Sequence, residues 1–485
     1  MKLSTIQASL DQLGMEPTRS LGQNFLHDQN LADWIVAQLK LQPDEAWVEI
    51  GPGLGALTEF ALARSQNGIV IEKDGRLAAF LHDRFPALEI VHGDASEFDV
   101  RDLFARGPVK VLGNLPYYVS SQILFGFTGE PSPVSALIFT LQKELAERLS
   151  AGPWTKEYGA LTLLIGRRWK VKYLRTLPGS VFMPAPKIES GVVLLTPRPA
   201  GELPACDGVL FTRLVKMGFA QRRKQLRKNL ADANLDWPAL CAHLGVKETT
   251  RAEELSLEQW IALTNFTTAS DHCRASAPLA SDPASPQSPN PAGGAPALQS
   301  PLKAGGTPAL QLEHAAQDVH GEIFDVVDAE DRVTGQLSRH EVHRQKLLHR
   351  AVHIFVFNEH GDLFLQRRSR WKDTHPLRWD SSAAGHVNSG DTYAGTAPRE
   401  IEEELGVSAP VEEIGALPPS QATGWEHVRL YRARHDGPFR LNPAELDSGG
   451  FFTLEQIDRW TAARPQDFAT GFLECWRLFR SGAKS

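Results

Sequence analysis

Three polar side chains stand at the ends of short apolar runs in the first part of the chain. Glu72 ends the run IVIE, Asp94 follows LEIVHG, and Asn114 ends KVLGN. An earlier run, WVEI at 47–50, leads into the glycine turn Gly51-Pro52-Gly53-Leu54-Gly55. Glycines let a backbone turn tightly and approach a ligand, and the N–H groups of the next helix can bind it. Glu72 is placed to accept hydrogen bonds from ribose hydroxyls.

The elements that position these residues are strands alternating with helical patterns, such as LTEFALARS at 57–65. This alternation predicts a doubly wound α/β sheet whose ligand lies beyond the carboxyl ends of the strands. The turn also fits the pattern GxGxxA, so a nicotinamide or flavin dinucleotide stays open on this evidence alone.

The segment Asn114-Leu115-Pro116-Tyr117 indicates chemistry on an amino group. The nitrogen of an adenine amino group is a poor nucleophile because its lone pair is delocalised into the ring. The Asn114 oxygen and a nearby backbone carbonyl can accept both N–H bonds and direct the lone pair at the sulfonium methyl of S-adenosylmethionine. Pro116 keeps Leu115 extended, and Tyr117 offers a face for an extruded base.

Residues 15–265 resemble the ribosomal RNA small-subunit adenine dimethyltransferase family. The matching segments, in the family's order, are Leu21–Leu26, Val48–Gly55, Gly113–Tyr117, Leu141–Glu144, Phe182–Lys187 and Gln221–Lys224. The resemblance implies a seven-stranded Rossmann-like methyltransferase sheet followed by a small helical domain.

The same resemblance implies an S-adenosylmethionine site formed by Asn24, Leu26, Gly51, Gly53, Glu72, Asp94 and Asn114. Asp94 would hold the adenine amino group of the cofactor. Asn114, Leu115, Pro116 and Tyr117 would act on the target base, with Phe182 as a second stacking partner. The implied reaction adds two methyl groups to each of two adjacent adenines in the 3′-terminal hairpin of small-subunit (16S) rRNA, in the 30S subunit. A large-subunit rRNA enzyme and a non-catalytic ribosome assembly factor are the alternatives.

A basic middle on an acidic background is typical of a protein that holds a polyanion. Residues 143–228 carry 17 Lys and Arg against 6 Asp and Glu, although the whole chain has a net charge of −7. We expect phosphate contacts from Arg222, Arg223, Lys224, Arg227 and Lys228, with the pairs 223/227 and 224/228 on one helix face. Arg167, Arg168, Lys170, Lys172 and Arg251 are further candidates.

A second cluster of acids lies near the carboxyl end of the chain. Glu400, Glu403 and Glu404 have the spacing i, i+3, i+4 and would share one face of a helix. Three carboxylates so close repel one another, and a hard cation such as Mg²⁺ would relieve this. Arg399 can pair with one of them.

The spacing of this segment resembles the Nudix box of hydrolases that act on nucleoside diphosphates linked to another group. It runs from Gly385 through Asp391 to Arg399-Glu400-Ile401 and Gly406-Val407, with Asp391 where the family usually has Glu. The resemblance implies an α/β/α domain in which metal bridges diphosphate oxygens, and Arg367 and Arg368 are candidate phosphate clamps. Strands at 351–357 and 362–366 would form a hairpin through 358–361.

Within that superfamily, residues 322–407 most resemble the isopentenyl-diphosphate isomerase branch, through Leu365–Ser369 and Trp379–Ser382. The isomerases place a catalytic cysteine where this chain has Ala384. Isomerase activity is therefore not expected, and a pyrophosphohydrolase or a silent ligand sensor remains.

The composition divides the chain into parts. Of the residues 271–310, 26 of 40 are Pro, Ala, Gly or Ser, which predicts a disordered linker. We expect a methyltransferase domain at 1–200, a small helical RNA-contacting domain at 201–268, the linker at 269–317, and a Nudix domain at 318–485. The linker shows no sign of a fixed interface, so the two units should be independent. The absence of an apolar leader or span and the scattered cysteines predict a cytoplasmic protein with no membrane partner.

Overall fold

The computed structural model describes residues 2–17, 23–199, 201–233, 235–275, 322–370, 372, 374–442 and 445–482. Most of the predicted linker and part of the segment Leu21–Leu26 lie outside these residues. In the part of the chain that the structure describes, no helix combines the length and apolarity needed to cross a membrane.

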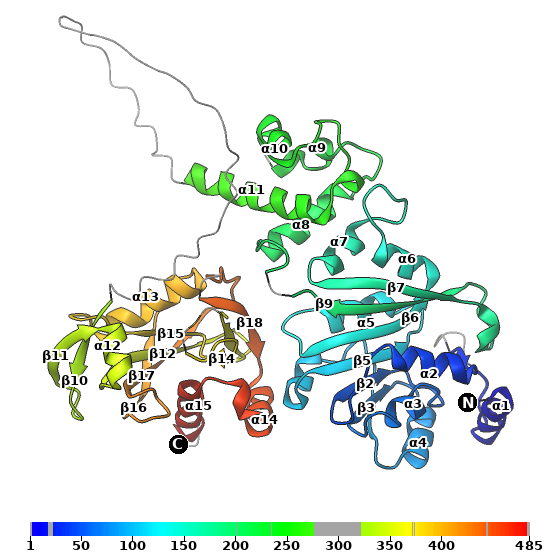
Figure 1. Cartoon of the computed structure of the whole chain (residues 1–485), viewed down its shortest axis with the longest axis horizontal. Helices are drawn as coiled ribbons and strands as arrows, with labels where there is room; N and C mark the ends of the chain where they lie inside the picture. The colour runs from blue at the N-terminus through cyan, green and yellow to red at the C-terminus, as the bar shows by residue number, and fades with distance from the viewer. Residues whose placement is uncertain are drawn as a thin grey trace, which may run out of the picture.

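A seven-stranded sheet forms the centre of the first unit (Figure 1). Its strands run in the order β4-β3-β2-β5-β6-β9-β7, of which β2 to β6 are parallel and β9 is antiparallel to both of its neighbours. The bounds are β2 Ala46–Ile50, β3 Gly68–Glu72, β4 Glu89–His92, β5 Val109–Asn114, β6 Val134–Gln142, β7 Trp169–Leu177 and β9 Ser190–Pro197.

Apolar side chains on both faces of these strands make the sheet a buried central layer. Val48 packs in one hydrophobic cluster and Trp47 in another, because successive residues of a strand point to opposite faces. Helices cover the sheet: α2 Gln29–Ala37, α3 Thr58–Leu62, α4 Gly75–Arg84, the 3-10 helix η2 Val100–Arg106, α5 Ser120–Thr128, α6 Lys143–Ser150 and α7 Ala160–Gly166. The predicted α/β fold is confirmed.

An additional helix closes one side of the glycine turn. Helix α1, Leu3–Gln12, buries Ile6 and Leu10 against Leu54 and Leu77. Next to it, the two-residue strand β1, Phe25–Leu26, pairs with β8, Phe182–Met183. These contacts bring the first residues of the chain to the carboxyl ends of β2 and β3.

A cluster of helices follows the sheet and packs around Phe211 and Trp260. Its elements are α8 Gly208–Gly218, α9 Leu226–Asn229, α10 Trp237–Leu244 and α11 Leu257–Ala275, with short 3-10 turns between them. Helix α11 continues past the predicted boundary at residue 268. The reason is local, because the first helix-breaking residue after it is Pro278.

The predicted helix face for residues 223 to 228 is wrong. Arg222, Arg223 and Lys224 lie in a turn, and α9 begins only at Leu226. Gln225 has an extended backbone and forms an isolated bridge with Arg251, which takes the chain out of helical geometry.

The second unit has a seven-stranded mixed sheet between helices. Strand β12 pairs with β13 through the predicted hairpin, with β15, and in parallel with β17. The bounds are β12 His349–Phe357, β13 Leu363–Arg368, β14 Trp379–Asp380, β15 Ala383–His386, β16 Glu412–Leu417, β17 Glu426–Arg434 and β18 Leu446–Phe452. A separate pair, β10 Ile323–Val327 and β11 Val333–Ser338, precedes α12 Arg339–Gln345, and the remaining helices are α13 Tyr393–Leu405, α14 Leu454–Ala463 and α15 Thr470–Gly482.

The two units are in contact, so the expectation that they would be independent is wrong. Phe104 of η2 belongs to the same hydrophobic cluster as Trp379 and Trp460 of the second unit. A single Phe between charged residues, in the sequence VRDLFAR, is too short a pattern to indicate a docking surface.

Candidate active sites

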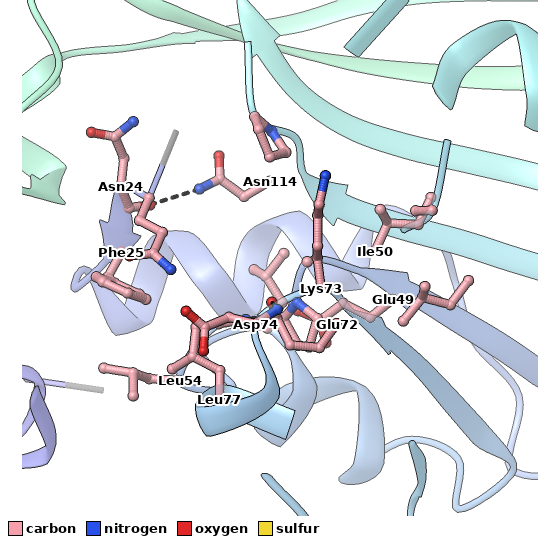
Figure 2. Close-up of a pocket in the computed structure, with 18 of the residues that line it drawn as sticks. Asn24, Phe25, Glu49, Ile50, Leu54, Glu72, Lys73, Asp74, Leu77 and Asn114 are labelled. Atoms are coloured by element: carbon pink, nitrogen blue, oxygen red, sulfur yellow. Dashed lines mark hydrogen bonds between the residues drawn. The ribbon is translucent and has the colours of Figure 1, made fainter. Parts of the chain in front are cut away.

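A pocket of about 110 Å³ opens at the carboxyl ends of β2, β3 and β5 (Figure 2). The seven residues predicted to hold a cofactor all line it: Asn24, Leu26, Gly51, Gly53, Glu72, Asp94 and Asn114. They come from separate elements and converge because parallel strands end at the same edge of the sheet.

The glycine turn brings one backbone N–H group to the Glu72 carboxylate, and the chain after β3 brings another. Gly51 and Gly53 have φ values of +61° and +59°, which L side chains rarely adopt. This conformation directs the Gly53 N–H at Glu72 Oε2, 3.1 Å away, while Asp74 N donates to Oε1 at 2.9 Å. Burial raises the pKa of Glu72, and these backbone hydrogen bonds oppose the rise.

Asp94 is held as a carboxylate at the edge of the pocket. Its side chain accepts hydrogen bonds from Lys73 Nζ at 2.6 Å and from the backbone and hydroxyl of Ser96. These donors, Lys73 first, lower the pKa of Asp94 to about 2. An ionised acceptor suits an amino group of a ligand.

The Asn114 side chain is oriented by its neighbour across the pocket. Its Nδ2 donates a 2.9 Å hydrogen bond to the backbone carbonyl of Asn24, the dashed line in Figure 2. Because the nitrogen is engaged in this way, the amide oxygen is the atom available to accept from a ligand.

Of the other residues predicted to act on the target base, only one lines the pocket. Pro116 lines the pocket, Tyr117 is half-buried with its hydroxyl 2.7 Å from Ser190 Oγ, and Leu115 and Phe182 are core residues. Tyr118, which the motif analysis does not include, also lines the pocket and is 57% exposed. Its position after Tyr117 was the available signal.

Glu49 is an acid of the pocket that the sequence analysis does not identify. It lies in β2, lines the pocket, is 1% exposed, and accepts a 2.6 Å hydrogen bond from Thr58 Oγ1. Burial, with some repulsion from Glu72, raises the pKa of Glu49 to about 8. A charged residue inside the apolar run WVEI was the signal that could have found it.

Some of the side chains predicted to contact RNA form ion pairs within the protein, and others do not. Arg222 pairs with Glu253 and Arg227 with Glu248. Arg223, Lys224 and Lys228 are exposed and have no ion-pair partner among the described residues. The latter three are therefore the more available to phosphate groups.

In the second unit, the acidic side chains of α13 lie next to β13 and β15. Glu404 is buried and accepts from Gln366 Nε2 and from the backbone N–H of Ala384, both at 3.1 Å. A side chain at Gly385 would overlap the Glu400 carboxylate, so glycine permits this close approach. Glu403 is exposed, and Arg399 bridges it to Glu400 with contacts of 3.0 Å.

These residues fit a hard cation. Burial and mutual repulsion raise the pKa of Glu400 to about 8, and burial raises that of Glu404 to about 7. The buried Gln366 Oε1 beside them accepts no hydrogen bond from the part of the chain that the structure describes. Two crowded carboxylates and an unsatisfied amide oxygen are the ligand type that Mg²⁺ prefers.

The two candidate phosphate clamps, Arg367 and Arg368, form ion pairs with acids near the acidic site, and their predicted role stays a prediction. Arg368 pairs with the buried Asp380 at 2.8 Å, and Arg367 pairs with Asp447 at 3.5 Å. Ala384 occupies β15 at the edge of the site and offers no thiol. Asp391 is exposed in the turn before α13.

The second unit also contains a cluster of histidines that the sequence analysis does not predict. His343, His349 and His386 place one ring nitrogen each within 4.8 Å of one another, and Glu426 Oε1 lies 3.1 Å from His386 Nε2. The buried His349 Nε2 has no hydrogen-bond partner among the described residues and lies 3.6 Å from Glu426 Oε1. Three imidazoles beside a carboxylate can hold a divalent transition metal. The histidines come from α12, β12 and β15, so only the folded chain unites them.

Comparisons with known proteins separate the same two units. Residues 15–269 match the family described as ribosomal RNA adenine dimethylase, and residues 347–470 match the NUDIX domain. Ribosomal RNA small subunit methyltransferase A of Aromatoleum aromaticum is 39% identical over 252 residues, covering 51% of this chain and 93% of that protein. Its namesake from Leptothrix cholodnii is 39% identical over 251 residues, covering 51% and 91%. The crystal structure of DR0079 from Deinococcus radiodurans is 28% identical, with a TM-score of 0.28, and covers 33% of this chain and 98% of that one.

Proposed function

The chain belongs to the ribosomal RNA adenine dimethylase family, and from this membership we propose that its first unit dimethylates adenine N6 in small-subunit rRNA with S-adenosylmethionine. The single observation that carries the proposal is the Asn114 amide, oriented by Asn24 in the same pocket as Glu72 and Asp94. We assign the target to two adjacent adenines of the 3′-terminal hairpin in the 30S subunit.

S-adenosylmethionine, when bound, supplies an activated methyl group on a sulfonium. Glu72 would accept from the ribose and Asp94 from the adenine amino group of the cofactor. Asn114 Oδ1 and a neighbouring backbone carbonyl would accept the two N–H bonds of the target amino group, which localises its lone pair on nitrogen. Bound S-adenosylmethionine would supply the methyl group from its sulfur to N6, and the amino group held by Asn114 would release one proton to solvent.

The target base needs a place to stack once it leaves the RNA. Tyr117 and Phe182 are the partners expected from the family. Tyr118 is the aromatic side chain that is both exposed and at the pocket. We propose that Tyr118 contributes to this platform, and that Arg223, Lys224 and Lys228 hold the RNA backbone nearby.

Mass spectrometry of rRNA tests this function. Isolated 30S and 50S subunits lacking the modification are incubated with the full chain and S-adenosylmethionine, with Asn114→Ala in parallel. We expect dimethyladenosine in the 30S rRNA with the parent and none with the variant. Product only in 50S rRNA would favour the large-subunit alternative, and no product in either would favour an assembly factor.

For the second unit we propose a Mg²⁺-dependent pyrophosphohydrolase acting on a nucleoside diphosphate linked to another group. The buried pair Glu400 and Glu404, with Glu403 and Arg399 beside it, carries this proposal. Glu400 and Glu404, with the Gln366 amide oxygen beside them, would hold Mg²⁺, which when bound would supply charge neutralisation for a diphosphate and an activated water. Ala384 in place of a thiol argues against isomerase chemistry.

A panel of nucleoside diphosphate derivatives tests the second activity. Glu404→Gln should abolish Mg²⁺-dependent product release, while Glu402→Gln, which changes an exposed acid on the same helix, should leave it intact. Absence of release by the parent on every substrate would favour a ligand sensor.

A further inference from the structure

An aromatic ring from the first unit fills the core of the second. Phe104 is 7% exposed, and its ring centroid lies 4.2 Å from that of Trp460, 5.5 Å from Phe452 and 5.7 Å from Trp379. The hydrophobic cluster that contains Phe104 otherwise consists of residues from 351 onward. Its own neighbours in η2, Val100 and Leu103, pack instead in the core of the first unit.

Polar contacts beside Phe104 join the η2 segment to α14 and β18. Gln456 Nε2 of α14 donates to Asp99 at 2.9 Å and to Asp102 at 3.0 Å. Arg459 also pairs with Asp102 at 2.7 Å. Arg101 Nη1 donates to the backbone carbonyl of Phe451 at 2.5 Å. An apolar anchor within a ring of polar contacts is the usual anatomy of a specific interface.

Two glycines allow the surfaces to approach closely. A Cβ on Gly107 would lie 2.7 Å from the Arg464 guanidinium carbon, and a Cβ on Gly450 would lie 2.6 Å from the Pro131 ring. One glycine belongs to each unit: a side chain at Gly450 would meet the rigid Pro131 ring, and one at Gly107 would displace the end of the Arg464 side chain. The close contact between the two units therefore depends on these glycines as well as on Phe104.

The contact lies away from the methyl-transfer pocket. Phe104 and Gly107 precede β5, whereas Asn114 ends it, so the two sites are at opposite edges of the sheet. Five strand steps between Val109 and Asn114 span roughly 17 Å. Figure 1 shows α14 on the side of the second unit that faces the first.

The docking surface is also connected to the acidic site. Trp379 contacts Phe104, and the next residue in β14, Asp380, pairs with Arg368 on the other face of the strand. Asp380 is paired in the sheet with Gln366, which donates to Glu404. The strand under the acidic site therefore has one face against the first unit.

We propose that the Nudix unit is permanently docked on the methyltransferase unit, with Phe104 completing the Nudix core and supporting β14 beneath its acidic site. The occupant of the η2 surface is thus the chain's own second unit. Loss of Phe104 would loosen β14 and α14 while leaving the cofactor pocket unchanged.

Cleavage of the connecting segment tests the docking in the full chain. A protease site inserted between residues 293 and 294 is cut, and the product is passed over a size-exclusion column at micromolar concentration. We expect the parent halves to elute together near the 53.5 kDa of the uncut chain, and the halves of Phe104→Asp to separate. Separation of the parent halves would overturn the proposal.

Hydrogen exchange of the uncut chain tests the role of the ring. Phe104→Ala should speed exchange at least tenfold in peptides covering Trp379–Asp380 and Leu454–Ala463, with binding of S-adenosylmethionine unchanged. Phe125→Ala removes a ring of the same size that is 44% exposed on α5, and it should change neither. Equal exchange in Phe104→Ala and the parent, or equal effects of both variants, would overturn the proposal.

A charge reversal tests the orientation of the docked units. Asp102→Arg would oppose Arg459, and we expect a several-fold increase in the dissociation of the cleaved halves. Adding Arg459→Asp restores an opposite-charge pair and should recover association. Failure of the double variant to improve on Asp102→Arg would contradict the orientation.

Discussion

The Asn114 side chain donates an amide hydrogen to the Asn24 backbone carbonyl across 2.9 Å, and this bond fixes the orientation of the amide at the pocket. The bond joins the end of a central strand to a residue ninety positions earlier in the chain. In the function that we propose, the Asn114 oxygen would thereby be positioned before any substrate arrives, which would lower the entropic barrier to reaction.

Replacing Asn114 with Asp should remove this orientation, because a carboxylate has no hydrogen to donate to the Asn24 carbonyl. We expect the single-turnover rate of methyl transfer to fall by about 100-fold or more. Cofactor affinity, measured by calorimetry, should change much less. Asn265→Asp is the matched control, since Asn265 also donates to a backbone carbonyl at 2.9 Å but lies in the helical cluster. Full activity of Asn114→Asp would contradict the assigned role.

Glu72→Gln should weaken cofactor binding. The glutamate accepts from the backbone of Gly53 and Asp74, and an uncharged amide makes weaker bonds to both and to a ribose. We expect the dissociation constant for S-adenosylmethionine to rise by about tenfold or more. Glu59→Gln, on the exposed side of α3 in a pair with Arg84, should leave it unchanged. Equal affinities would show that Glu72 is a structural residue only.

Glu49 should make the stability of the first unit depend on pH. Burial raises the pKa of Glu49 to about 8 in the folded chain, from an ordinary 4.5. The folded state then holds a proton that the unfolded state has released, so stability falls as pH rises from about 4.5 to 8 and levels off above 8. Between these pH values the free energy of unfolding should fall less in Glu49→Gln than in the parent, by about 2 kcal/mol or more. Urea unfolding of the first unit at pH 5.5 and 8.5 measures this, and equal pH slopes would refute it.

Arg223 and Lys224 should contribute to RNA affinity through charge alone. We expect the double alanine variant to bind rRNA more weakly for all sequences tested and to reduce the salt slope by about 0.7 per removed charge. Fluorescence anisotropy between 50 and 200 mM salt checks both values. Arg332→Ala together with Lys346→Ala removes the same charge from the second unit and provides the comparison. A change in sequence preference would indicate base contacts instead.

The histidine cluster should bind one equivalent of a transition metal such as Zn²⁺. His386→Ala removes a ligand that already contacts Glu426, and we expect metal affinity to fall by at least about tenfold in a chelator competition assay. His360→Ala, an exposed histidine in the β12–β13 turn, should have no effect. Persistence of the site in His386→Ala would mean that the three imidazoles do not form it.

The cofactor pocket could be predicted from the sequence because its parts follow local rules. Glu72, Asp94 and Asn114 each end a readable strand, and parallel strands bring such ends together. The clustering of the acids of α13 could be predicted for a similar reason, because residues four apart share a helix face. In both cases the pattern needs no knowledge of distant contacts.

Other features depend on pairing between distant segments, which no local pattern records. His343 and His386 meet only because β15 pairs with β12 beside α12. Phe104 is one aromatic residue in a polar stretch, and its burial depends on a surface more than 270 positions later. The basic run 222–228 was misjudged as helical because the bridge from Gln225 to Arg251 is invisible in the sequence.

Helix α1 has a practical consequence for handling the protein. Ile6 lines the pocket, and only three residues separate it from Lys2. A fusion at that end would start roughly 6 Å along the helix axis from the pocket wall. An affinity tag there can alter measured cofactor affinity without touching a reactive group, so purification handles belong after residue 482.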